Sequence, residues 1–293
     1  MAEVRVREIL ESDGPTSTSS RVPFRPSNNA NLTVVILTLN EARRLSTCLA
    51  AIPQRYPVLV VDCGSTDGTV GIAEADGCKV TTNPWSGFSA QRNFALRQCD
   101  ITSKWVLFID ADEVFPQKFY DWFETEIKDR DDFDVGQVAS ILYFKGKPLR
   151  YVPAYPMYHP RLVRRGHAHF VPNHTNHGEA ANADARELLI DIPYLHDWFD
   201  GDLVSWLHKH VKLAAQEANL KSSYDGLPTA RAKLSLLFQS ALVRVPGRFF
   251  FHYFWRGGFR DGRYGFEYAM MYTWFEFTKG LIKLGNGTVK DGK

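Results

Sequence analysis

The sequence has few cysteines and no long apolar run, and both absences narrow the class of protein. Its four cysteines among 293 residues are widely spaced and form no C-x-x-C pair, which excludes a dense disulfide framework of the secreted kind. This cysteine usage favours a reduced, cytoplasmic setting. The apolar run Leu234 to Val243 has ten residues, whereas a helix that spans a bilayer needs about 20. We therefore expect no membrane-spanning helix.

Motifs of several enzyme classes are also missing. The sequence contains no G-x-x-x-x-G-K-[ST], no G-x-G-x-x-G and no G-x-S-x-G, which argues against an NTPase, a Rossmann dinucleotide site and a serine hydrolase. Residues 1–31 lack the apolar core of a signal peptide and are rich in Ser, Pro and Asn. We expect them to form a flexible tail ahead of a folded body that starts near Leu32.

The composition is that of a globular protein with an uneven distribution of charge. A chain of this length with 44% hydrophobic and 13% aromatic residues can bury a full core. The net charge is +2, but residues 1–202 carry 21 Lys and Arg against 27 Asp and Glu, and residues 203–293 carry 14 against 6. This asymmetry predicts that the C-terminal part faces an anionic partner.

Apolar runs alternate with segments of helical spacing from Leu32 to Glu126. Strands are expected for "LTVVILTLN", Val58 to Val61, "CKVTTN" and "WVLFIDADE". Helices are expected for "EARRLSTCLAAI", Thr69 to Asp76 and "GFSAQRNFALRQC". Such alternation is typical of βαβ units, so the pattern predicts an α/β fold with a mostly parallel sheet flanked by helices.

Three of the expected strands end in polar residues, namely Asn40-Glu41, Asp62 and Asp110-x-Asp112. Ligands of parallel sheets bind beyond the carboxyl ends of the strands, so this edge is where a nucleotide would lie. Two carboxylates one residue apart repel each other and are costly to bury, and a cation such as Mg²⁺ or Mn²⁺ would offset both effects. The alternative is that Asp110 caps the following turn and Asp112 is solvated.

Four motifs in this order give the chain a resemblance to a known family. The stretches "VVILTLNEARRLSTCLAAI", "VVDCGSTDGTV", "GFSAQRNFAL" and "WVLFIDADE" resemble those of family 2 glycosyltransferases of GT-A fold, notably the subgroup similar to lipopolysaccharide-core glucosyltransferases. The resemblance covers about residues 32–280 and implies a GT-A domain over 32–202. It also implies inverting transfer from a nucleotide-sugar donor, expected to be a UDP-sugar, to a glycan or lipid-linked acceptor in surface polysaccharide biosynthesis.

The resemblance further implies site residues and a divalent cation, Mg²⁺ or Mn²⁺. The donor residues are Thr38, Asn40 and Glu41 around the nucleotide, Asp62 against the uracil, Ser65 and Asp67 in the loop after it, Gln91 and Arg92 beside the donor pocket, and the D-x-D pair Asp110 and Asp112. Asp110 and Asp112 are both expected to serve the metal, Asp112 as its direct ligand and as a residue that acts in catalysis.

The general base is sought in "HAHFVPNHTNHGEAA". Similar proteins have a His-Glu pair here, whereas Gly178 separates His177 from Glu179 in this chain. We assign Glu179 as the candidate base and His177 as a metal or diphosphate contact. A zinc site or ordinary histidines are the alternatives.

The stretch "YPMYHPRLVRR" matches a family segment of acceptor-side sheet. Its Arg161 and Arg164, with Arg165 after them, could meet phosphate or acceptor anions or form a solvated charged edge.

Residues 203–293 form a helical, basic and aromatic segment. Leu203, Leu207, Val211 and Ala214 have helical spacing, and Phe, Tyr, Trp and Arg are frequent after residue 230. Interfacial helices combine these residue types, so we expect peripheral contact with the inner face of the cytoplasmic membrane. The alternative is that the aromatics pack this segment on the catalytic domain. No nucleic-acid motif accompanies the positive charge, so nucleic acid is not an expected partner.

A second function class stays open at this point. A chain that kept the fold but lost turnover would be a scaffold or a sugar-nucleotide-binding partner. The presence of Asp62, Asp110 and Asp112 favours catalysis.

Overall fold

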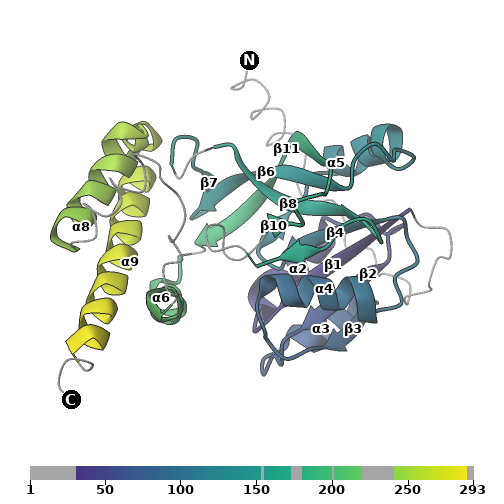
Figure 1. Cartoon of the computed structure of the whole chain (residues 1–293), viewed down its shortest axis with the longest axis horizontal. Coiled ribbons are helices and arrows are strands. Elements are labelled where there is room, and N and C mark those ends of the chain that lie inside the picture. Colours follow the sequence, from purple (N-terminus) through teal and green to yellow (C-terminus); the bar gives the residue numbers. More distant parts are fainter. Residues whose placement is uncertain (1–30, 153–154, 173–179, 200, 220–240, 289–293) are drawn as a thin grey trace. The chain divides into compact units, whose positions relative to one another are not determined.

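In a computed structural model the chain forms two compact units. Figure 1 shows the helices and strands of the whole chain. The described residues are 31–152, 155–172, 180–199, 201–219 and 241–288. The first unit comprises Met1–Ile141 and Pro156–His196, and the second comprises Leu142–Tyr155 and Asp197–Lys293. The expected tail over residues 1–31 lies, except for Asn31, outside the described residues.

Up to residue 110 the chain alternates strands and helices as the sequence predicts, and further short elements follow up to residue 127. The elements are β1 (Leu32–Thr38), α2 (Ala42–Ala50), β2 (Val58–Asp62), α3 (Thr69–Ala75), β3 (Lys79–Thr82), α4 (Phe88–Gln98), β4 (Trp105–Asp110), β5 (Glu113–Val114), α5 (Gln117–Trp122) and the π-helix η1 (Phe123–Ile127). The strands that follow are β6 (Val135–Phe144), β7 (Lys147–Pro148), β8 (Met157–Arg164), β9 (Phe170–Val171), β10 (Ala180–Ala181) and β11 (Glu187–Phe199).

The main sheet has a parallel half and an antiparallel half. Its order is β3-β2-β1-β4-β8-β6-β11-β5, with β7 beside β6. Strands β3, β2, β1 and β4 are parallel, whereas β8 pairs antiparallel with both β4 and β6. The register sets Thr38 beside Asp62 and Leu37 beside Asp110, so three strand ends meet at one edge. The predicted α/β fold is confirmed, and the antiparallel half extends it.

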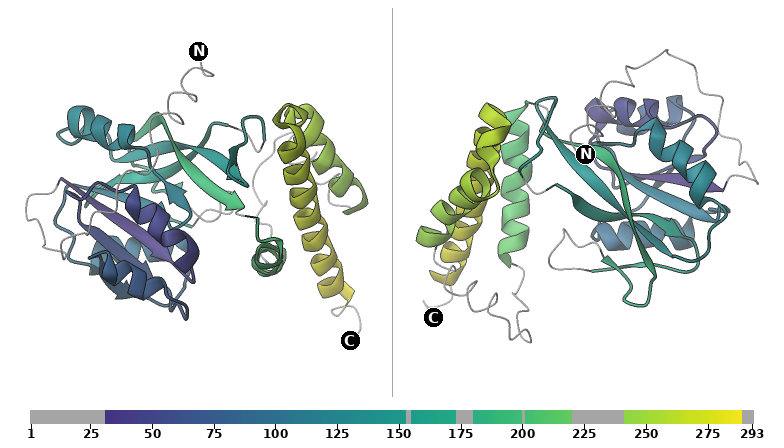
Figure 2. Two further views of the ribbon diagram at one scale, coloured as in Figure 1. Left: turned by 180° about the vertical axis from the view of Figure 1, so that it is seen from behind. Right: turned by 90° about the horizontal axis from the view of Figure 1, so that it is seen from above.

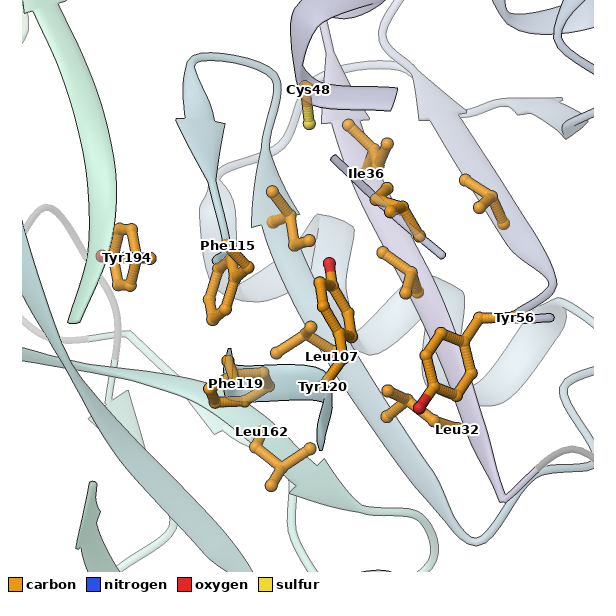
Figure 3. Packing of buried hydrophobic residues seen from close by; sticks show 14 of the residues in the cluster. Leu32, Ile36, Cys48, Tyr56, Leu107, Phe115, Phe119, Tyr120, Leu162 and Tyr194 are labelled. Atoms are coloured by element: carbon orange, nitrogen blue, oxygen red, sulfur yellow. The ribbon is translucent and has the colours of Figure 1, made fainter. Parts of the chain in front are cut away.

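Alternate side chains of the parallel strands feed two apolar clusters, one on each face of the sheet. One cluster joins Ile36 and Leu107 to residues of α2, α5 and η1, and the other joins Val35 and Phe108 to α4. This alternation follows from the two-residue repeat of a strand. Figure 3 shows part of the first cluster, in which Leu107 lies near Tyr120 of α5. Both faces of the parallel half of the sheet are thus buried. Functional residues are therefore expected at the ends of these strands.

The second unit is mainly helical. Its helices are α6 (Leu203–Asn219), α8 (Ala241–Phe250), the π-helix η2 (Phe251–Trp255), the 3-10 helix η3 (Gly258–Asp261) and α9 (Gly262–Thr288). Figure 2 shows α8 and α9 side by side. A cluster that includes Phe144, Phe199, Trp206 and Tyr268 forms its core. The predicted helical spacing from Leu203 onward is confirmed by α6, and no helix among the described residues is long and apolar enough to cross a membrane.

Candidate functional site

Asp62 ends β2 and is a buried acceptor of four hydrogen bonds. Its Oδ1 accepts the backbone N–H groups of Gly64 at 2.9 Å and Ser65 at 2.7 Å. Its Oδ2 accepts the hydroxyl groups of Thr38 at 2.8 Å and Ser65 at 2.5 Å. Burial alone would raise the pKa of Asp62, but these hydrogen bonds outweigh it and lower the pKa. An ionised Asp62 therefore holds the ends of β1 and β2 together.

Further hydrogen bonds tie the loop after β1 to the loop after β2. The backbone N–H of Asn40 donates to Ser65 Oγ at 2.8 Å, and Asn40 Oδ1 accepts the backbone N–H of Thr66 at 2.8 Å. Asn40 has a φ of 56°, a left-handed conformation that asparagine tolerates better than most residues. The backbone N–H of Ala42 donates to Asp67 Oδ2 at 3.2 Å. The two loops predicted to surround the nucleotide are thus held together by hydrogen bonds.

Gln91 of α4 fixes the segment that follows β3. It is fully buried, and its Nε2 donates to the backbone carbonyls of Asn83 at 3.0 Å and Pro84 at 2.8 Å. Its Oε1 accepts the side-chain amide of Asn83 at 2.8 Å. We interpret Gln91 as a residue that shapes the loop around Asn83.

Two arginines flank the carboxylate of Asp110. Arg92 Nη2 lies 3.1 Å from Oδ1 of Asp110, and Arg161 Nη2 lies 3.0 Å from Oδ2. Arg161 also donates to Glu113 Oε1 at 2.6 Å, and Glu113 Oε2 accepts the backbone N–H of Asp110 at 3.0 Å. Glu113 is buried, which raises its pKa to about 7 although Arg161 opposes the shift. The turn is therefore bridged by the side chain of Glu113 rather than capped by that of Asp110.

These ion pairs bear on whether Asp110 needs a cation to compensate its charge. The repulsion between Asp110 and Asp112 predicted a cation as the compensating charge. The structure shows that the guanidinium groups of Arg92 and Arg161 already compensate Asp110. A guanidinium on each side also fixes the orientation of this carboxylate.

Asp112 lies between helix α2 and strand β11. Its side chain is 14% exposed, and its Oδ2 is 3.6 Å from His196 Nε2 and 3.7 Å from Arg44 Nη1. Arg44 is also 3.7 Å from Glu41 Oε2. Burial alone would lower the pKa of His196, but the carboxylates of Asp112 and Glu113 outweigh it and raise the pKa. The alternative of a solvated Asp112 is therefore wrong.

The side chains at Asp112 could ligate a divalent cation whose remaining ligands come from a substrate. Mg²⁺ commonly takes one or two carboxylates and completes its shell with phosphate oxygens and water, and imidazole nitrogen suits several transition metals. Asp112 and His196 provide one ligand of each kind, whereas both oxygens of Asp110 face arginines. Within the described ranges, no three His, Cys, Asp or Glu side chains converge into a metal cluster.

Three residues of this site were given no role by the sequence analysis: Arg44, Glu113 and His196. Arg44 of α2 comes three residues after Glu41, the residue that precedes this helix. This spacing puts both side chains on one side of the helix and is visible in the sequence. Glu113 adjoins the D-x-D motif. His196 has no local signal, because only the pairing of β11 with β5 brings it opposite Glu113.

The remaining predicted residues fall into two groups. His177 and Glu179 lie outside the described residues. Arg164 donates to Asp134 Oδ1 at 2.5 Å, and Arg165 donates to the carbonyl of Ser103 at 2.9 Å. A solvated charged edge is therefore wrong for Arg161 and Arg164, which are both buried by partners within the protein.

Comparisons with known proteins identify a family for the chain. A family model described as glycosyl transferase family 2 matches residues 33–183. An uncharacterized glycosyltransferase of Rickettsia prowazekii is 33% identical over 42% of this chain and 43% of its own length. The chain thus spans less than half of that relative.

One further relative and one solved structure align over most of the chain. The lipopolysaccharide core biosynthesis glycosyltransferase LpsC of Rhizobium meliloti is 26% identical over 82% of this chain and 86% of its own length. The crystal structure of residues 1–349 of TarS from S. aureus with UDP-GlcNAc is 15% identical, covers 88% of this chain and 92% of that one, and gives a TM-score of 0.45.

Proposed function

The chain belongs to glycosyl transferase family 2, whose model matches more than half of it, and we propose that it transfers a sugar from a UDP-sugar to an acceptor hydroxyl. The observation that carries the proposal is the meeting of three strand ends. The register of β2, β1 and β4 brings Asp62, Thr38 and Asp110 to one edge of the sheet. This edge is where nucleotides bind in parallel α/β sheets.

The residues at this edge have separate roles in the proposal. The linked loops after β1 and β2, which contain Asn40, Glu41, Ser65 and Asp67, would surround the nucleoside. Asp62 would face the uracil or, through its hydrogen bonds, hold the loop that does so. Gln91 and Arg92 of α4 would border the donor and keep its surroundings rigid.

Asp112 and His196 would hold the divalent cation, and His177 would add a contact to the metal or the diphosphate. Mg²⁺ or Mn²⁺ bound there supplies positive charge to the departing diphosphate. Asp110, held by Arg92 and Arg161, would keep the turn that presents Asp112 in place. In the proposal Asp112 therefore contacts the leaving group only through the cation, and Asp110 positions Asp112.

Inversion requires a base on the acceptor side. In the proposal the acceptor oxygen forms its bond to the anomeric carbon as the bond from that carbon to the diphosphate breaks. The carboxylate of Glu179 takes the hydroxyl proton, and the electron pair leaves with the nucleoside diphosphate. The support for Glu179 is its position in the sequence after His177.

The acceptor proposed here is a glycan or a lipid-linked glycan of a surface polysaccharide. Its support is the likeness to LpsC, which is named for lipopolysaccharide core biosynthesis. The competing proposal is a scaffold that binds a sugar nucleotide without turnover. The intact arrangement of Asp110 and Asp112 favours the enzyme.

Release of nucleoside diphosphate from a panel of UDP-, GDP- and dTDP-sugars tests the reaction. We expect release from one UDP-sugar with Mg²⁺ or Mn²⁺ and none with chelator. Asp112→Asn and Glu179→Gln should each lower the rate by at least about 100-fold, because each removes a group used in the transition state. The matched control is Asp129→Asn, since Asp129 is an exposed aspartate. Donor binding without turnover in any condition would favour the scaffold.

A further inference from the structure

The second unit exposes an aromatic surface that the proposed reaction does not use. Its most exposed side chains are Trp255 at 77%, Phe250 at 57%, Phe254 at 51%, Phe259 at 50% and Phe266 at 44%. We call these five residues the aromatic patch. They come from α8, η2, η3 and α9. Large aromatic side chains gathered on a surface usually mark a place of contact.

The aromatic patch is continuous across these elements. The rings of Phe250 and Phe254 lie 5.3 Å apart between centroids. Tyr253 links this pair to the rings of Phe259 and Phe266, with centroid distances of 5.0 Å to Phe254, 6.5 Å to Phe259 and 5.6 Å to Phe266. Trp255 follows Phe254 in the sequence. Neighbouring exposed rings of this kind form a contiguous apolar surface rather than a set of isolated side chains.

An apolar stripe continues the patch along α9. Met270, Phe277, Leu281 and Leu284 are 49%, 44%, 50% and 62% exposed. Together with Phe266 they repeat at intervals of three, four or seven residues, which places them on one face of the helix. The exposed apolar surface therefore extends over several turns of α9.

The charge around the aromatic patch is positive. Residues 241–288 contain seven Arg and Lys and three carboxylates. The carboxylates are all engaged within the second unit. Asp261 accepts backbone N–H groups of residues 150–152, Glu267 pairs with Lys145 and Arg263, and Glu276 pairs with Lys279.

Two arginines stand within the sequence of the patch itself. Arg256 follows Trp255, and Arg260 follows Phe259, with its guanidinium carbon 5.8 Å from the centre of that ring. Aromatic rings beside arginines match the depth profile of a membrane surface, where the rings enter the headgroup region and the cations meet anionic headgroups.

We propose that the aromatic patch, with Arg256 and Arg260, docks the protein on a bilayer of anionic phospholipid. A second copy of the chain fits the same surface less well, because the three carboxylates of residues 241–288 already have partners within the unit and a self-complementary contact there would pair Arg256 and Arg260 with none of them. The docking stands apart from sugar transfer, since none of these residues belongs to the candidate site in the first unit.

Flotation of the full chain with lipid vesicles tests the docking. We expect binding to vesicles of phosphatidylcholine with phosphatidylglycerol, much weaker binding to phosphatidylcholine alone, and release as salt is raised, because the headgroup attraction is screened. The double variant Phe254→Ser, Trp255→Ser should bind anionic vesicles at least about tenfold less, since it removes two large side chains from the contact. Arg256→Gln should weaken binding and flatten its salt dependence.

The controls distinguish docking from misfolding and from nonspecific adsorption by exposed apolar residues. Val204→Ser in α6 and Leu189→Ser in β11 each change an apolar residue that is 65% exposed and outside the patch, and both should bind vesicles as the wild type does. Every variant should keep the far-UV spectrum, the unfolding midpoint and the UDP affinity of the parent chain. Vesicle binding that is equal in the wild type and the double variant would overturn the proposal. A dimer that dissociates in the double variant, without vesicle binding by the wild type, would overturn it as well.

Discussion

At the scale of single residues, the site depends on carboxylates that the protein has already paired. Asp62 accepts four hydrogen bonds, and Asp110 lies between two guanidinium groups. Neither side chain is a free ligand waiting for substrate. Asp112 lies 3.6 Å from His196 and 3.7 Å from Arg44. In the proposed reaction the two aspartates of the D-x-D motif have different roles: Asp110 positions the turn, and Asp112 contacts the cation.

Asp62→Asn tests the role of this buried carboxylate. The pKa of Asp62 is lower in the folded state than in the unfolded state. The ionised side chain therefore stabilises the fold fully at any pH above the ordinary carboxyl pKa. This contribution is lost as the pH falls through the folded-state pKa. We expect the free energy of unfolding at neutral pH to fall by about 1–2 kcal/mol in the variant. The difference from the wild type should shrink at a pH below the folded-state pKa, where the wild-type carboxyl is also protonated.

Urea unfolding at both pH values measures this difference. Asp129→Asn, at an exposed position, is the control and should change little at either pH. An equal loss of stability at both pH values would show that the ionised form of Asp62 is not what the fold uses.

At the scale of elements, close backbone contact explains the glycine-rich stretch "RGGFRDGRYGF". A Cβ added to Gly265 would lie 2.0 Å from the carbonyl oxygen of Gly258, and one added to Gly258 would lie 2.6 Å from the carbonyl oxygen of His252. Gly257, with a φ of 77°, has a left-handed conformation that suits glycine. The stretch is thus required for the tight connection from η2 through η3 to α9.

Gly265→Ala should therefore destabilise the second unit. The obstructing atom is backbone and cannot rotate away, so we expect a loss of at least about 1–3 kcal/mol, as for an overpacked core. The matched control is Gly285→Ala in the same helix, where an added Cβ meets nothing within 4 Å. This control should leave stability unchanged or raise it slightly, since alanine favours a helix. Thermal unfolding of both variants measures the contrast, and equal midpoints would contradict it.

The sequence predicted the elements from β1 to β4 well, because each of the first three apolar strands is followed by a helix of regular spacing. It did not predict the antiparallel half of the sheet. In β11 the exposed, half-buried and buried positions do not alternate cleanly, so a period of two is hard to recognise. The same limit applies to the site. Arg92 and Asp110 lie on motifs visible in the sequence, whereas Arg161 and His196 come from β8 and β11, and only the pairing of strands brings them there.

At the scale of the whole molecule, the uneven charge has a structural counterpart. The excess of basic residues after residue 202 belongs mainly to the helical unit that carries the aromatic patch. The excess of acidic residues belongs to the unit that carries the strand-end site. One chain thus combines a site proposed for a nucleotide sugar with a surface proposed for anionic lipid.

The central claim is that Asp112 binds a UDP-sugar through a divalent cation, and equilibrium titration with UDP tests it most directly. Calorimetry should show UDP binding to the wild type with Mn²⁺ or Mg²⁺ and much weaker binding with chelator. In Asp112→Asn the metal-dependent part should fall by at least about tenfold, which is 1.4 kcal/mol, while Asp129→Asn should bind as the wild type does. If UDP does not bind under any metal condition, or if Asp112→Asn keeps the full metal dependence, the account of this site is contradicted.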